Sequence, residues 1–150
     1  MGQDQGIIFQ TSCEHLQTFI KISLANIPRF ENSIVTNSTN GLRIKTDFNA
    51  TGSVENVTFS NITLSNIKSY GIDIQQDYLN GGPTGVPSNG VRVADIKFSG
   101  ISGWVVPVAM DYYVLCGNGS CTDFRFHDVD IRGGSSESSC NYPPGGCPSL

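Results

Sequence analysis

Arg43 and Lys45 are the residues of this chain whose types and spacing most clearly indicate chemistry. They stand two positions apart in an apolar segment, residues 40–46. Side chains on a β-strand alternate between its two faces, so both cations are expected on the outer face, with Leu42 and Ile44 turned inward. Two cations fixed on a rigid sheet predict a local binding site for an anionic ligand.

The composition indicates which elements position these cations. Only 15% of the 150 residues are charged and 17 are glycine, which is typical of one β-rich domain with polar turns. The net charge of −4 and the lack of a basic block argue against a nucleic-acid or membrane-surface binder. No stretch is long and apolar enough to span a bilayer.

An apolar repeat runs along the chain. Four segments with the same apolar frame start at Leu24, Val54, Val93 and Cys121. One interval is longer because residues 80–89 read as an inserted polar loop. A second short strand follows within each unit, at Leu42-Arg43-Ile44, Ile72-Asp73-Ile74 and Tyr113-Val114-Leu115.

Period-2 apolar runs with a repeat near 30 residues predict a parallel β-helix, although an ordinary β-sandwich also has many short strands. Stacked turns would place Arg43 beside Asp73 and Lys45 beside Gln75 on one outward face. The apolar residues of the frame, Phe30 and Ile34 among them, are expected inside. Asn residues at the turns could form hydrogen-bonded ladders.

Several features favour a secreted, disulfide-bonded protein. Sequons at Asn37, Asn49, Asn56, Asn61 and Asn118 predict glycosylation. Cys116 and Cys121 flank one short loop and Cys140 and Cys147 another, so each pair is expected to form a disulfide. Cys13 has no evident partner, and the N-terminus lacks the features of a signal peptide. These observations lead to the expectation that the chain is the C-terminal part of a longer protein.

Three stretches resemble the fungal endopolygalacturonases of glycoside hydrolase family 28. They are the Asn-Gly-Leu-Arg-Ile-Lys segment at residues 40–45, the strand ending in Gln-Asp-Tyr at residues 71–78, and the loop at residues 80–91. The resemblance implies an all-β, right-handed parallel β-helix that hydrolyses the α-1,4-galacturonate backbone of pectin with inversion. It also implies that Arg43 and Lys45 bind the galacturonate carboxylate beside the scissile bond and that Tyr78 lines the same cleft.

The chain departs from the family pattern on its N-terminal side. The family's catalytic aspartates lie in an Asn-Thr-Asp segment and an Asp-Asp pair, and neither occurs here, so no catalytic residue is assigned. His15 follows Cys13 where the family has Gly-His-Gly; it is a relic of the catalytic histidine or, more in keeping with its surroundings, an ordinary surface residue. Residues 1–30 are therefore interpreted as an atypical segment, partly helical in its spacing, and residues 31–150 as the C-terminal turns of a β-helix truncated at its N-terminal side.

The expected function is accordingly that of a polygalacturonase whose isolated chain is inactive. The alternative is a non-catalytic pectin-binding or structural module; a lyase is disfavoured because no carboxylate cluster for calcium is visible. No cofactor or metal site is expected, and the partner is polygalacturonate, bound by a monomer. Four further residues are assigned structural roles: His127 is expected on the surface, and the core is preferred over sugar stacking for Trp104, Tyr112 and Tyr113.

Overall fold

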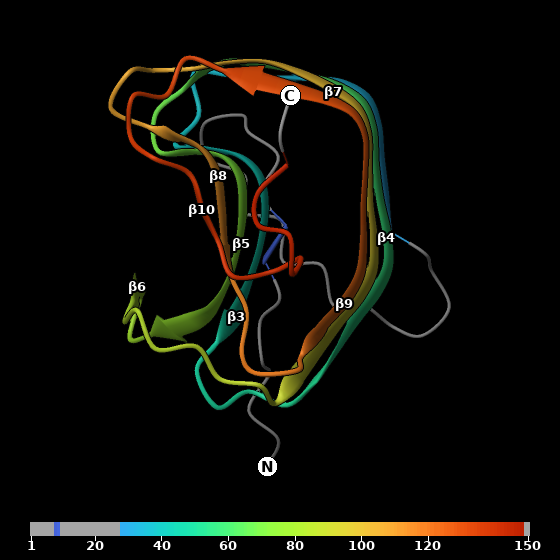
Figure 1. The fold of residues 1–150 in the computed structure, drawn as a ribbon, viewed down its shortest axis with the longest axis vertical. Coiled ribbons are helices and arrows are strands. Elements are labelled where there is room, and N and C mark those ends of the chain that lie inside the picture. The colour runs from blue at the N-terminus through green and yellow to red at the C-terminus, as the bar shows by residue number, and fades with distance from the viewer. Residues whose placement is uncertain (1–7, 10–27, 149–150) are drawn as a thin grey trace.

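The computed structural model describes residues 8–9 and 28–148 of the chain. Within these ranges every regular element is a β-strand. The strands form two sheets on opposite sides of a common apolar interior, and successive passes of the chain stack behind one another (Figure 1). The prediction of an all-β fold built from stacked parallel strands is confirmed, while right-handedness stays a prediction.

The two sheets differ in length and in the strands they contain. Sheet A has the order β1-β3-β5-β8-β10, with β6 paired to β5. Its strands are β1 (Ile8–Phe9), β3 (Asn40–Asp47), β5 (Tyr70–Leu79), β6 (Gly82–Pro83), β8 (Met110–Leu115) and β10 (Ser139–Cys140). Sheet B has the order β2-β4-β7-β9, with strands β2 (Arg29–Thr36), β4 (Gly52–Ile67), β7 (Val91–Val105) and β9 (Cys121–Arg132). Apart from the short β1 and β6, the strands pair in parallel.

The register of sheet B follows the sequence repeat. Val54 pairs with Val93, and Val93 pairs with Cys121. One inward column consists of stacked phenylalanine rings with centroids 5.0, 5.1 and 5.0 Å apart, from Phe30 through Phe59 and Phe98 to Phe126. Each stacked pair stabilises the fold by roughly 0.5–1.5 kcal/mol beyond the area it buries, so the column fixes the register of successive turns.

Polar residues in the left-handed conformation form columns at the bends of sheet B. Asparagine, aspartate and glycine tolerate a positive φ better than other residues. Asn61 Nδ2 donates to Asn32 Oδ1 at 2.7 Å, and Asn66 Nδ2 donates to Asn37 Oδ1 at 2.6 Å. The suggested asparagine ladders are therefore present. The columns are Asn56, Asp95 and Asp123; Asn32, Asn61, Gly100 and Asp128; and Asn37 with Asn66.

These bends explain why the prediction for Ile34 is wrong. Ile34 was expected in the core but is 72% exposed, whereas Val35 is buried. The left-handed residue at Asn32 interrupts the two-residue alternation, so Ser33 takes the position equivalent to Ile62 and Ile34 faces outward.

The predicted core positions of the aromatic residues in the third turn are only partly correct. Ile72 pairs with Tyr112, so the third short strand is shifted by one residue from the predicted alignment. Tyr112 is buried as expected, but Tyr113 lies on the outer face, only partly covered. Trp104 is 62% exposed, so the core assignment is wrong for it. The inward position before it belongs to Gly103, where an added Cβ would lie 1.9 Å from the Leu64 carbonyl oxygen.

Both predicted disulfides are present, joining Cys116 to Cys121 and Cys140 to Cys147. His127 is exposed, as expected. Cys13 and His15 lie outside the described residues, as does most of the segment with helical spacing. The domain division at residue 30 stays a prediction.

We predict that replacing Asn61 separates the two contributions of a ladder residue. Asn61→Gly keeps the left-handed backbone and loses the amide hydrogen bond, which costs about 1 kcal/mol of unfolding free energy. Asn61→Ala also retains a Cβ in that conformation without the polar side chain that lets asparagine tolerate it, at a further cost of roughly 1–2 kcal/mol relative to Asn61→Gly. Urea unfolding of protein from a bacterial host measures both. In an ordinary strand position, glycine is less stable than alanine, so the predicted order is the reverse of the usual one. An alanine variant as stable as the glycine variant would contradict this account.

Candidate ligand-binding site

The strand β3 places Arg43 and Lys45 as the sequence predicts. Leu42 and Ile44 are each 1% exposed and face the core. The two cations therefore lie together on the outward face of sheet A. Parallel pairing sets Arg43 beside Asp73 and Lys45 beside Gln75 on β5, which confirms the predicted register.

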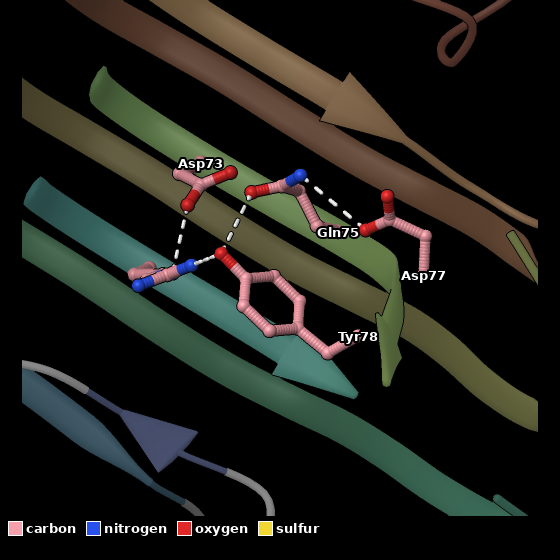
Figure 2. Close-up of polar contacts among 5 residues, drawn as sticks. Asp73, Gln75, Asp77 and Tyr78 are labelled. Carbon is pink, nitrogen blue, oxygen red and sulfur yellow. Dashed lines mark hydrogen bonds and ion pairs between the residues drawn. The ribbon is translucent and has the colours of Figure 1, made fainter. Parts of the chain in front are cut away.

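Asp73 forms an ion pair with Arg43. Its Oδ2 atom lies 2.8 Å from Arg43 Nε; the Asp73 side chain is fully buried and the Arg43 side chain is 11% exposed. Arg43 Nη2 donates a short hydrogen bond to the Tyr78 hydroxyl. Figure 2 shows the guanidinium held between these two partners. The contacts leave Nη1 and part of Nη2 available to a further acceptor.

The ring of Tyr78 contacts both cations. Lys45 Nζ lies 4.3 Å from the ring centroid, and Arg43 Cζ lies 4.8 Å from it. Tyr78 comes from the end of β5, where a register shift against β3 pairs it with Asp47. The electron-rich face of the ring attracts cations without neutralising them. The structure thus brings together the three residues Arg43, Lys45 and Tyr78.

Gln75 and Asp77 complete the polar cluster. As drawn in Figure 2, Gln75 Nε2 donates to Asp77 Oδ1 at 3.3 Å and Gln75 Oε1 accepts from Tyr78 at 3.4 Å. With the amide turned over, Nε2 instead lies 2.9 Å from Asp73 Oδ1, which gives it a better acceptor. The backbone N–H of Gly85 donates to Asp77 Oδ2 at 2.7 Å, so this carboxylate anchors the loop after β5.

Burial changes the acid–base properties of this cluster. Burial, opposed by Arg43 and assisted by the nearby Asp77, raises the pKa of the Asp73 carboxyl to about 7. Burial and, second, the charge of Arg43 lower the pKa of Lys45. Burial raises the pKa of the Tyr70 and Tyr113 phenols, whose rings stack 5.1 Å apart beside Asp73. The Asp73 carboxyl therefore exchanges a proton near neutral pH.

Arg43, Lys45 and Tyr78 were predicted from the sequence as site residues, whereas Asp73, Gln75 and Asp77 were not. The predicted pairing of Arg43 with Asp73 was the signal for the first of them. Their burial could not be anticipated, because every residue of β5 from Gly71 to Tyr78 is buried on both faces.

Other positions contribute little to this site. A hollow of about 500 Å³ lies over sheet B and is lined by Trp104 and Arg132, away from the cations. Among the described residues, no group of three His, Cys, Asp or Glu side chains is placed to hold a metal ion. No helix in that part of the chain is long and apolar enough to cross a membrane.

The stacked parallel strands define a solenoid-like all-β class, and comparison with known sequences specifies the family. The profile of the glycosyl hydrolases family 28 matches residues 23–149. The chain belongs to this family.

Individual relatives agree. The chain is 54% identical to a polygalacturonase of Fusarium fujikuroi over 121 residues. This aligned region covers 81% of the chain and 32% of that protein. It is 58% identical over 119 residues to endopolygalacturonase D of Aspergillus niger, covering 79% of the chain and 24% of the relative. A probable endopolygalacturonase A of Aspergillus kawachii is 52% identical over 117 residues, 78% of the chain and 32% of the relative. The chain thus spans a quarter to a third of the length of these relatives.

We predict that Asp73 makes stability depend on pH. Its pKa rises from 3.8 to about 7 on folding, so the folded state keeps a proton that the unfolded chain loses. This contribution to stability is complete below pH 4, declines as the pH rises, and is gone above pH 7; its upper bound is on the order of 4 kcal/mol.

Urea unfolding between pH 4.5 and 8 measures this effect. The unfolding free energy of Asp73→Asn, minus that of the native chain, is expected to increase with pH over this range. Glu137→Gln, at an exposed carboxylate, serves as the matched control and is expected to show no such increase. A constant difference between Asp73→Asn and the native chain would contradict the prediction.

Proposed function

We propose that this chain binds polygalacturonate and provides the carboxylate-recognition part of a polygalacturonase. Membership of glycosyl hydrolases family 28 and the activity for which the relatives are named support the substrate class. The observation that carries the proposal is the contact of Arg43, Lys45 and Tyr78 on one outward face. A galacturonate unit carries the anionic group that such a site would recognise.

The three side chains would divide the work of recognition. The planar guanidinium of Arg43 can make two parallel hydrogen bonds to a carboxylate, and Lys45 adds a compact positive charge. Tyr78 would hold both cations in place through its hydroxyl and its ring. Anchoring the carboxylate of one sugar would fix the orientation of the glycosidic bond beside it.

The hydrolytic step needs groups beyond this cluster. Inversion uses one protonated carboxyl and one carboxylate about 6.5–9.5 Å apart, with water between them and the sugar. The 150 residues contain neither an Asn-Thr-Asp segment nor an Asp-Asp pair. Asp73 is tied to Arg43 and Asp77 to the Gly85 N–H, so neither is assigned to this chemistry. We therefore propose that the isolated chain binds substrate without cleaving it.

A non-catalytic pectin-binding or structural module is the second candidate. The missing aspartate segments favour it, because a binding module needs only the cationic face. Both candidate functions predict that this chain alone binds polygalacturonate measurably without cleaving it. Cleavage by a longer protein containing these residues would distinguish them in favour of the enzyme.

Secretion and glycosylation belong to the same proposal. The asparagines of all five sequons are exposed, which is compatible with glycan attachment. The two disulfides fit an oxidising compartment. We propose a monomeric extracellular protein that needs neither cofactor nor metal and binds neither nucleic acid nor membranes.

We predict that Arg43→Gln weakens oligogalacturonate binding about 10–100-fold, because each lost charge-assisted hydrogen bond contributes roughly 1.5–3 kcal/mol. Lys45→Met is expected to weaken it less, and added salt weakens binding by the native chain. Titration calorimetry measures affinity, and release of reducing ends measures cleavage. Arg125→Gln is the control, since this exposed arginine lies on β9 of sheet B. Cleavage by this chain that survives both Arg43→Gln and Lys45→Met would contradict the assigned roles.

A further inference from the structure

Asp73 occupies an unusual position for a site expected to bind a carboxylate. It is itself a carboxylate, it is fully buried, and its Oδ2 lies 2.8 Å from Nε of the arginine assigned to the ligand. Two carboxylates would then share one guanidinium. Like charges brought together on a single partner oppose each other's ionisation, and burial strengthens the effect.

The geometry separates an orienting effect of Asp73 from its charge. Through the ion pair at Nε, Asp73 holds the buried guanidinium in place, and Tyr78 takes one N–H of Nη2. The edge formed by Nη1 and the second N–H of Nη2 then remains for a bidentate ligand. The positioning effect requires only a polar side chain of this size beside Nε, whereas the charge of Asp73 opposes a second anion.

We propose that Asp73 is a positioning residue for Arg43 and its internal counter-ion, and that polygalacturonate binds tightly when Asp73 is protonated. This inference rests on the proposed function. Binding of the ligand carboxylate is accordingly coupled to uptake of one proton by Asp73. The coupling is reciprocal: a proton on Asp73 favours the ligand by the same factor as the ligand favours the proton.

The surroundings of Asp73 determine which groups titrate with it. Arg43 and Lys45 face it from β3, Asp77 and Tyr70 from β5, and Tyr113 from β8. Both phenols stay neutral between pH 6 and 8, because burial raises their pKa above the ordinary value. Arginine stays charged throughout this range.

Two of these groups bear on the measurement. The raised pKa of Asp73, about 7, places its proton exchange inside the accessible range. The pKa of Lys45 is lowered, so Lys45 would also favour binding at lower pH if it titrated there. Its contribution is separated with Lys45→Met, which retains Asp73.

The test is titration calorimetry of oligogalacturonate into the full chain at pH 6, 7 and 8, in buffers of different ionisation enthalpy. If only the form with protonated Asp73 binds, affinity is about tenfold higher at pH 6 than at pH 8. The same model gives uptake of about half a proton at pH 7 and nearly one at pH 8. Lys45→Met is expected to bind more weakly and still to take up a proton on binding, because it retains Asp73.

Two variants of Asp73 divide orientation from charge. Asp73→Asn keeps a polar side chain of the same size beside Nε, so it is expected to bind with an affinity independent of pH and without proton uptake. At pH 8 it binds more tightly than the native chain. Asp73→Leu removes both the polar contact and the charge, so its affinity is expected to be independent of pH and lower than that of Asp73→Asn at every pH. Thermal unfolding of each variant checks that it is folded, and the proton uptake of the native chain tests the coupling without any variant.

The outcomes distinguish this inference from the proposed function. Suppose that the native chain binds oligogalacturonate without pH dependence or proton uptake, and that Arg43→Gln abolishes this binding. That result would overturn the role of Asp73 and leave the proposed function standing. Proton uptake that persists in Asp73→Asn would overturn it as well. No binding at any pH would overturn both.

Discussion

The register in which the parallel strands stack is the constraint on which the rest of the structure depends. A slip of one residue would turn every side chain to the opposite face. Columns of left-handed residues such as Asn61 and Asp95 bend each strand at equivalent points, and the stacked phenylalanines hold those points in line. The ion pair of Arg43 with Asp73 exists because this register holds in sheet A as well.

The features of the fold that could be predicted are those that local pattern and repetition determine. The alternation around Arg43 places Leu42 and Ile44 inside, and a constant offset between repeats pairs Arg43 with Asp73. Cys116 and Cys121 lie close in the sequence around a short loop, so their pairing needed little knowledge of the fold. Residue type was enough to predict that Arg43 and Lys45 form an anion site, whereas the chemical nature of the anion was predicted from the resemblance to a known family.

The features that could not be predicted depend on where alternation is interrupted. A left-handed residue takes one position at the bend, so counting in twos from Phe30 gives the wrong face for Ile34. Trp104 faces outward because Gly103 takes the close inward position that a larger residue would not fit. The burial of Asp73 and Asp77 was equally hidden, because outward positions of a sheet are expected to be solvated.

The buried charge of Asp73 is better explained by function than by stability. A buried ion pair often stabilises a protein no more than well-packed apolar residues of similar volume would, because desolvation offsets the attraction. The raised pKa of Asp73 indicates that Arg43 only partly compensates for burial. Tyr78 contacts the same cations and leaves their charge intact. An arginine oriented by a neutral ring alone would be a stronger but less regulated anion site. The carboxylate therefore makes sense as a group that limits how strongly Arg43 attracts an anion and makes that attraction depend on a proton.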